Sequence, residues 1–221
     1  MGKHWVRART NISRNDMSGG YRTYHPGDWF ECRNQELRAL LERGAIDTTA
    51  AVIREEFAFE DAAVLALAGH VTEGLEDFGI RVIHGDRLAL PAERVLLWTG
   101  ANLTAEAVAL GLSRLEATPD TLAWEMVAML QDARKLARDV GTQGERDKTL
   151  AAVGALELPV YDTGAVWVRR TDATEGVIQL WQDELDAGAD PQHAFLRSIY
   201  TRRVLLCTLP ANWIGASWRP A

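Results

Sequence analysis

The sequence is short of cysteine, of long apolar runs and of positive charge, and each shortage excludes a class of protein. Its 221 residues include two cysteines, Cys32 and Cys207, which are too few for the disulfide framework of a small secreted protein. No apolar run reaches the roughly 18 residues that a membrane-spanning helix needs. The net charge of −7 argues against a protein that coats nucleic acid. We therefore expect neither a membrane nor direct nucleic-acid contact.

The usual catalytic and cofactor-binding motifs are absent as well. The chain has neither of the glycine-rich patterns that cradle nucleotide phosphates, G-x-x-x-x-G-K-[ST] and G-x-G-x-x-G. It lacks the H-E-x-x-H and C-x-x-C spacings of zinc sites and the G-x-S-x-G turn of hydrolases. We expect Cys32 and Cys207 to be small core side chains, and His70 and His84 to be core or surface histidines. Because these motifs are absent, we expect no metal site and no cofactor.

What is present is the composition of a globular protein, 47% hydrophobic and 25% charged. At about 100–200 residues per domain, a chain of this length forms one or two domains. We expect a small module over residues 1–47 and a larger domain over residues 48–221. The predicted fold class is α+β, or mixed α/β, in which a small β-rich N-terminal module accompanies a helix-rich domain with a short mixed sheet.

The N-terminal segment alternates in the manner of strands. Residues 4–10 follow a two-residue period, and β-favouring residues return over 21–24 and 29–32. Between the last two runs, Pro26 fixes φ and the glycine after it permits positive φ, which is the chemistry of a tight turn. A short helix is expected to begin near Asn34 and to end at a glycine.

The central segment is predicted to be mostly helical. Apolar residues recur at three- and four-residue steps over 51–78, and again over 124–140 after a start near Pro119. Further helices are expected over about 104–115 and shortly before Ala155. Two short strands are expected, over 80–83 and 94–98, the second of the buried type.

The C-terminal segment is predicted to alternate strand and helix. Two short strands are expected around a turn at Asp162-Thr163-Gly164, followed by a helix capped by Thr171 or Asp172. A second helix is expected from Asp190 with Pro191 in its first turn. A buried strand over 204–209 is expected to end at a proline.

The same C-terminal segment carries a family resemblance. It reads LPVYDTGAVWVR over residues 158–169, then DPQHAFLR over 190–197 and VLLCTLP over 204–210. This succession resembles the C-terminal half of retaining GT-A glycosyltransferases, in which a strand entered through an Asn-[Ser/Thr]-Gly turn precedes a helix, an Asp-Gln pair and a Leu-Pro strand. The resemblance covers residues 156–214. It implies a nucleotide-sugar donor held with a divalent metal.

The resemblance also implies site residues. Asp162 and Asp190 would face the donor sugar, with Gln192 and His193 nearby. The sequence departs from the family pattern in three places: Asp162 stands where the family favours Asn, Pro191 separates Asp190 from Gln192, and no D-x-D metal motif is present. The alternative is that Asp162 belongs to a simple turn and that Asp190 is a helix N-cap.

The N-terminal segment resembles a small module of tailed-phage head, neck and tail proteins. The matching stretches are VRARTNI over residues 6–12, YHPGDWFE over 24–31 and LLERGAI over 40–46. In that module a V-x-A-x-x-N strand leads to a Y-x-P-G-D turn and a short helix. The resemblance implies a place in the virion, or otherwise in the host cytoplasm.

Together these resemblances predict a virion-associated structural protein of a tailed bacteriophage, which decorates the capsid or connects head and tail. It would act by contacts with other virion proteins, as a homo-oligomer or in many copies. Aromatic side chains and two arginines that could meet acidic partners are the expected interface residues: Trp5, Arg7, Arg9, Tyr24, Trp29, Trp213 and Trp218. The alternative is a GT-A glycosyltransferase that uses a nucleotide sugar and a divalent metal. A non-enzymatic role is expected ahead of an enzymatic one.

Overall fold

A computed structural model gives the structure of the chain. It describes residues 3–15, 20–48, 51, 59, 61–68, 71–100, 103–115, 124–132 and 134–210. Two compact units are present, one over residues 1–58 and the other spanning Phe59–Trp213, whereas the sequence predicted a boundary after residue 47. The expected mixed α+β class is confirmed.

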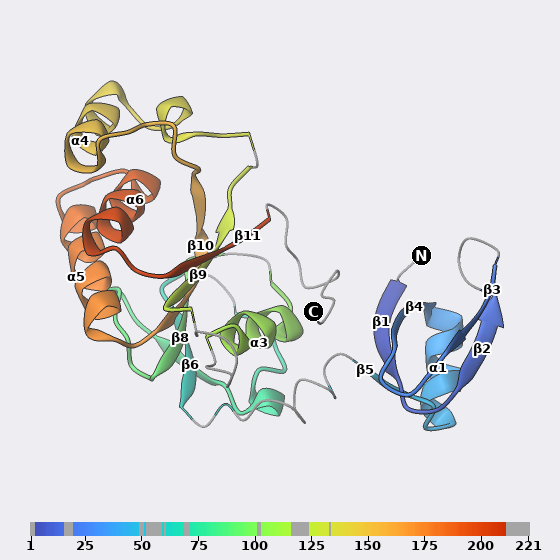
Figure 1. Cartoon of the computed structure of the whole chain (residues 1–221). Helices are drawn as coiled ribbons and strands as arrows, with labels where there is room; N and C mark the ends of the chain where they lie inside the picture. Colours follow the sequence, from blue (N-terminus) through green and yellow to red (C-terminus); the bar gives the residue numbers. More distant parts are fainter. Residues whose placement is uncertain are drawn as a thin grey trace. The chain divides into compact units, whose positions relative to one another are not determined.

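The N-terminal unit is built on a three-stranded antiparallel sheet in the order β4-β1-β5, with a separate hairpin of β2 and β3 (Figure 1). Its elements are β1 (Lys3–Ala8), β2 (Ile12–Asn15), β3 (Tyr21–Tyr24), β4 (Trp29–Arg33), α1 (Asn34–Glu42) and β5 (Ile46–Thr48). Alternation along β1 places Val6 and Ala8 in the core, where Val6 lies opposite Phe30. The structure confirms the strands expected over 4–10, 21–24 and 29–32, which are β1, β3 and β4, and the helix expected from near Asn34, which is α1. β2 and β5 were not predicted.

The larger unit is built on a six-stranded mixed sheet in the order β11-β9-β10-β8-β6-β7 (Figure 1). Its strands are β6 (Ala62–Ala66), β7 (Arg81–His84), β8 (Arg94–Trp98), β9 (Met126–Leu130), β10 (Tyr161–Arg169) and β11 (Leu206–Leu209). β6 pairs parallel with β7 and β8, and β9 pairs parallel with β11. β10 lies between these two groups and runs antiparallel to both β8 and β9.

Helices cover both faces of this sheet. The helices of this unit are α3 (Ala105–Ser113), α4 (Gln143–Val153), α5 (Asp172–Asp186) and α6 (Pro191–Arg202), with short 3-10 helices at Glu76–Phe78 and Ala137–Asp139. α4 packs on α6 rather than on the sheet. α5 and α6 pack on one face, where Trp181 and Phe195 join Val166 in one core cluster (Figure 1). α3 packs on the other face, where the Trp167 indole N–H donates to the Val108 carbonyl at 3.1 Å.

Two helices predicted for the central segment are wrong. Within the residue range 51–78 the structure has β6, and within 119–140 it has β9 and a 3-10 helix, while residues 52–58 and 116–123 lie outside the described residues. All five residues of β6 and four of the five in β9 are buried. A strand buried on both faces is a continuous apolar run, which periodicity does not separate from a buried helix.

The remaining expectations for this unit agree with the structure except at one turn and at the last strand. The strand expected to be buried over 204–209 is the edge strand β11 (Leu206–Leu209), in which Leu209 is buried and the other three residues are half-buried or exposed. The strands at 80–83 and 94–98 are present as β7 and β8, and the helix at 104–115 as α3. The helices of the C-terminal segment are α5, capped by Thr171, and α6, capped by Asp190. The two strands expected around Asp162-Thr163-Gly164 are instead one strand, β10.

Close packing of α3 on the sheet depends on a glycine. A Cβ placed on Gly111 would lie 2.2 Å from Cε2 of Trp167, which is completely buried. We expect Gly111→Ala to lower the free energy of unfolding by about 1–3 kcal/mol, because the ring has no room to move. Chemical denaturation followed by tryptophan fluorescence measures this change.

Gly144→Ala is the matched control for this prediction. Gly144 lies in the first turn of α4, and its added Cβ would meet nothing closer than 3.9 Å. The substitution should raise stability by about 0.4–1 kcal/mol, because alanine has less conformational freedom in the unfolded chain. Equal effects of the two substitutions would contradict the close approach of α3 to Trp167.

Candidate functional site

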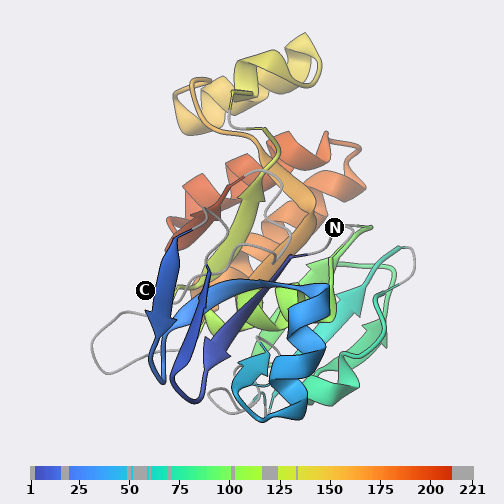
Figure 2. The ribbon, with the colours of Figure 1, turned by 90° about the vertical axis from the view of Figure 1, so that its right-hand side faces the viewer.

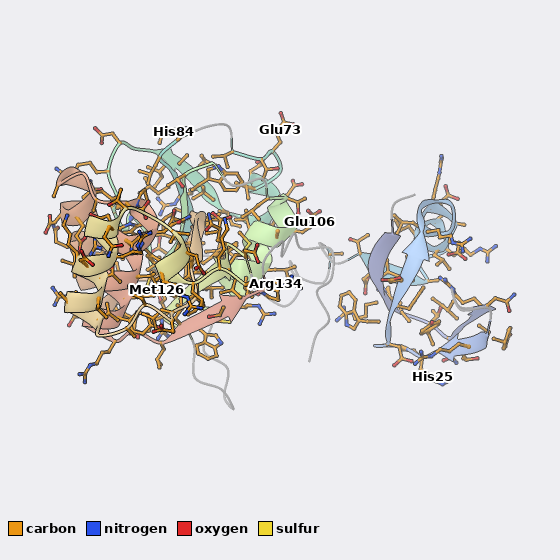
Figure 3. The ribbon with its side chains drawn as sticks, turned by 90° about the horizontal axis from the view of Figure 1, so that it is seen from above. His25, Glu73, His84, Glu106, Met126 and Arg134 are labelled. Carbon is orange, nitrogen blue, oxygen red and sulfur yellow. The ribbon has the colours of Figure 1, made fainter. Side chains whose placement is uncertain are left out.

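The carboxyl ends of β6 and β8 form the first candidate site. β6 pairs with β7 on one side and with the parallel strand β8 on the other. The chain that leaves β6 continues to β7, whereas the chain that leaves β8 continues to β9 on the opposite side, so the two connections diverge between β6 and β8. In open α/β sheets, ligands bind at the carboxyl ends of strands at such a switch point. Charged residues follow the strand ends here: Glu73 after β6, Glu106 after β8 and Arg134 after β9 (Figure 3).

A bulge in β10 adjoins the end of β8. β10 pairs with β9 at Asp162, and the pairing resumes only at Val166, with a shift of register between them. Thr99, directly after β8, closes the bulge: its hydroxyl donates to the Thr163 carbonyl at 2.8 Å and its N–H to the Gly164 carbonyl at 2.9 Å. The bulge replaces the expected turn: β10 is one strand over Tyr161–Arg169, and its pairing with β8 begins at Ala165.

Asp162 shapes this bulge with its own carboxylate. The N–H of Gly164 donates to Asp162 Oδ1 at 2.8 Å, which is the geometry of an Asx turn. Among the described residues, Oδ2 has no hydrogen-bond partner. One oxygen of Asp162 is therefore structural and the other is available to a ligand.

Asp190 has the role of a helix cap. Its Oδ1 accepts hydrogen bonds from the N–H groups of Gln192 and His193, both at 3.1 Å, at the start of α6. Within the described part of the chain, no hydrogen bond or ion pair joins Asp162 to Asp190 or to the half-buried Gln192. The structure thus gives each aspartate a local structural role and forms no shared carboxylate pair.

The carboxyl end of β8 also holds a buried donor. Trp98, the last residue of β8, is 2% exposed, and its indole N–H has no hydrogen-bond partner among the described residues. A buried polar group without a partner costs free energy and often marks a place where water or a ligand completes the bond. No sequence pattern indicated this donor.

The described residues do not provide the metal ligands that the GT-A resemblance implies. No three side chains of His, Cys, Asp or Glu in the described ranges lie close enough together to hold an ion. A hard divalent cation requires several oxygen ligands. These residues therefore do not fit the implied metal, and no step of a reaction is derived through it.

The expected interface residues of the N-terminal unit have different environments. Tyr24 is 8% exposed and stacks on Phe30 with ring centroids 4.5 Å apart, so it lies in the core rather than on the surface. Arg7 and Arg9 both pair with Asp47, at 3.3 and 3.5 Å. Trp29 is half-buried on β4. The side chains of Trp5, Trp213 and Trp218 lie outside the described part of the chain.

A buried cluster of polar side chains, which we call the Arg197 cluster, joins α4, α5 and α6. The Arg197 side chain is 5% exposed and contacts both Glu145 and Glu184. Its Nε donates to both carboxylate oxygens of Glu184, at 2.9 and 2.7 Å, and its Nη2 donates to Glu145 at 2.9 Å. Its Nη1 donates to the Thr149 hydroxyl at 2.8 Å. His193 completes the cluster.

His193 extends these contacts toward Val140. Its Nε2 lies 3.2 Å from the Val140 carbonyl and its Nδ1 2.8 Å from the Thr149 hydroxyl. A carbonyl only accepts, so this pattern assigns the proton to Nε2 and makes Nδ1 the acceptor. The Thr149 hydroxyl then accepts from Arg197 and donates to His193. Because these atoms satisfy one another in a buried place, the Arg197 cluster is structural rather than an open catalytic centre.

Opposite charges keep the Arg197 cluster ionised. Burial alone would raise the pKa of Glu145, but hydrogen bonds from Lys148 and Arg197 outweigh it, so its pKa lies below the ordinary value of 4.5. Burial would likewise lower the pKa of Arg197, and its bonds to Glu184 and Glu145 raise it above its ordinary value. The only sequence signal for the Arg197 cluster would have been the four-residue spacing of its polar side chains, His193 and Arg197 on α6 and Glu145 and Thr149 on α4.

The Arg197 cluster should make the stability of the protein depend on acid pH. The pKa of Glu145 is lower in the folded chain, so its stabilising effect is complete above about pH 4.5 and is lost as pH falls through the folded value. We expect the drop in unfolding free energy between about pH 7 and about pH 3 to be smaller in Glu145→Gln than in the wild type. Urea denaturation at a series of pH values measures it.

Glu157→Gln is the control for this pH dependence. Glu157 pairs with Arg138 at 3.5 Å, but both side chains are more than half exposed, so the pair contributes little. The Glu157 variant should keep the acid sensitivity of the wild type. An identical pH profile in Glu145→Gln would show that the ion pairs of Glu145 do not stabilise the fold.

Comparison with known proteins found no family model, curated protein or solved structure that matches this chain. Among the described helices, none combines the length and apolar character needed to span a bilayer.

Proposed function

We propose that residues 59–213 form a nucleotide-sugar-binding domain of the GT-A glycosyltransferase type. The observation that carries this proposal is the order of elements in the region of resemblance. β10 is followed by α5, then by α6 capped by Asp190, and then by β11, which ends immediately before Pro210. This is the succession of strand, helix, Asp-capped helix and Leu-Pro strand that the resemblance implies.

The switch point beside β6 and β8 is the proposed place of the nucleotide sugar. Ligands of open α/β sheets bind there because strand ends and loop backbone converge without a covering helix. Trp98 supplies a buried N–H that has no partner among the described residues, and Asp162 supplies one free carboxylate oxygen. A carboxylate oxygen accepts hydrogen bonds from sugar hydroxyls, so Asp162 would position the sugar.

The proposal concerns binding, and it assigns no catalytic residue. Asp190 uses its carboxylate to cap α6. Replacing Asp190 would weaken the helix by about 1 kcal/mol as well as any ligand contact, so its substitution does not separate the two roles. Asp162 is the better probe, because asparagine in its place keeps an oxygen for the Gly164 N–H.

Calorimetric titration with UDP-, GDP- and TDP-sugars, with and without Mn²⁺, tests the proposal. We expect binding of at least one nucleotide sugar, and a loss of affinity of about tenfold in Asp162→Ala, as removal of a hydrogen bond to a charged group gives. Asp162→Asn should retain binding, since it preserves the bulge and restores the residue that the family favours.

Asp172→Ala is the control for Asp162→Ala. Asp172 is an exposed acid in the first turn of α5, so its loss removes the same charge away from the switch point. It should leave affinity unchanged. Absence of heat with every nucleotide sugar, or equal affinity of the wild type and Asp162→Ala, would overturn the proposal.

We also propose that the N-terminal unit attaches the chain to a phage virion through protein contacts. The observation that favours this is that residues 1–58 are a compact unit with a core of their own, built from residues that match the phage module. In the described part of this unit, β4 pairs only with β1, so the other side of β4 is an open strand edge that carries Trp29. Open edges can pair with a strand of another chain.

Incorporation of variants into phage particles tests this attachment. Trp29→Ala should reduce the amount of the protein in purified particles by about tenfold or more, as loss of a large aromatic contact does at an interface. Circular dichroism would verify that the fold is intact. Trp124→Ala, which removes a 41% exposed tryptophan from the larger unit, should not change incorporation. Unchanged incorporation of Trp29→Ala would exclude β4 as the contact.

A further inference from the structure

A hollow of about 410 Å³ lies between the end of α6 and the edge strand β11, and we call it the β11 hollow. It is lined by Tyr161, Ile199, Tyr200, Arg203, Val204 and Leu206. α6 leads directly into β11 at this edge of the sheet (Figure 1). The β11 hollow shares β10 with the switch point beside β6 and β8, but its other lining residues come from α6, from β11 and from the connection between them.

Two tyrosines and three aliphatic side chains make most of the lining. Tyr161 is 5% exposed, and its hydroxyl lies 3.4 Å from that of Thr208. Tyr200 is 40% exposed, and burial, together with the nearby Tyr161, raises the pKa of its phenol. The raised pKa keeps the Tyr200 phenol protonated at physiological pH, so its hydroxyl can donate a hydrogen bond. Rings beside aliphatic groups suit a ligand with an apolar, planar body.

Arg203 is the charged residue of this lining and has an unusual backbone. It ends α6 with φ of +58°, and among the described residues it is the one non-glycine residue with positive φ. This left-handed position at the end of a helix is usually glycine, because a side chain there is strained. An arginine in this strained conformation, at the edge of a hollow, points to a role beyond ending the helix.

No described side chain neutralises the guanidinium of Arg203. The structure gives it no hydrogen bond or ion pair with any described residue. Elsewhere in this unit the exposed arginines Arg87 and Arg170 do have carboxylate partners, at 2.7 and 2.6 Å. A free guanidinium offers a planar fork of donors that matches a carboxylate or a phosphate.

We infer that the β11 hollow binds an anion with an apolar, planar body. Arg203 pairs with the carboxylate or phosphate of this ligand, while Tyr161 and Tyr200 contact its body. The site is separate from the proposed nucleotide-sugar site, and it does not depend on that proposal.

Fluorescence and calorimetric titrations with three matched probes test this inference on the full chain. The probes are naphthoate, naphthyl phosphate and uncharged naphthol. We expect the wild type to bind at least one of the two anions more tightly than naphthol, and the stronger of them identifies the acidic group. Arg203→Gln should lower anion affinity about tenfold and leave naphthol unchanged, since it removes charge and keeps much of the side chain.

Two further variants separate binding from folding. Arg202→Gln removes the same charge from the neighbouring residue, which does not line the β11 hollow, and should leave all affinities unchanged. Arg203→Gly should melt at the same temperature as the wild type or higher, because glycine relieves the left-handed strain, yet lose anion binding.

Three results would overturn the inference. The first is no binding of either anion by the wild type, and the second is equal anion affinity in Arg203→Gln and the wild type. The third is an equal loss of affinity in Arg202→Gln, which would indicate general attraction of anions to the surface. Each is independent of the nucleotide-sugar titration, which probes Asp162.

Discussion

The larger unit depends on the antiparallel strand β10, which pairs with β8 on one side and β9 on the other. Without it, the parallel group β7-β6-β8 and the parallel pair β9-β11 would not form one sheet. Its buried residues also join the two helical layers, because Val166 contacts the α5–α6 side and Trp167 reaches the backbone of α3. The start of the same strand carries Asp162 in the bulge and Tyr161 in the β11 hollow.

Two kinds of packing hold the helices in place. α5 and α6 bury Trp181 and Phe195 against the sheet, with ring centroids 4.7 Å apart, which is ordinary apolar packing. α4 is different, because it lies beside α6 (Figure 2). The residues it buries are Glu145 and Thr149, and both contact Arg197 of α6. A buried ion pair is weak evidence for stability, but removing one partner is costly because it leaves a buried charge unpaired. Protonation of Glu145 at acid pH should therefore weaken the packing of α4 on α6.

Sequence could predict the elements whose ends carry strong signals. α5 and α6 begin at Thr171 and Asp190, whose side chains accept N–H groups of the first turn. β6 and β9 could not be separated from helices, because burial on both faces removes the alternation that marks a strand. The Arg197 cluster was missed for another reason: Glu145 and Arg197 are 52 positions apart, and only the packing of α4 on α6 brings them together.

The two proposed ligand sites lie on opposite sides of one short stretch of β10. Tyr161 and Asp162 are consecutive and both pair regularly with β9, so their side chains point to opposite faces of the sheet. Tyr161 points to the face covered by α6, where the β11 hollow lies. A ligand on Asp162 and a ligand beside Tyr161 therefore do not compete for space. The two sites are nevertheless linked through the backbone of β10. A movement of the bulge held by Thr99 and Gly164 would displace the start of β10, and with it Tyr161.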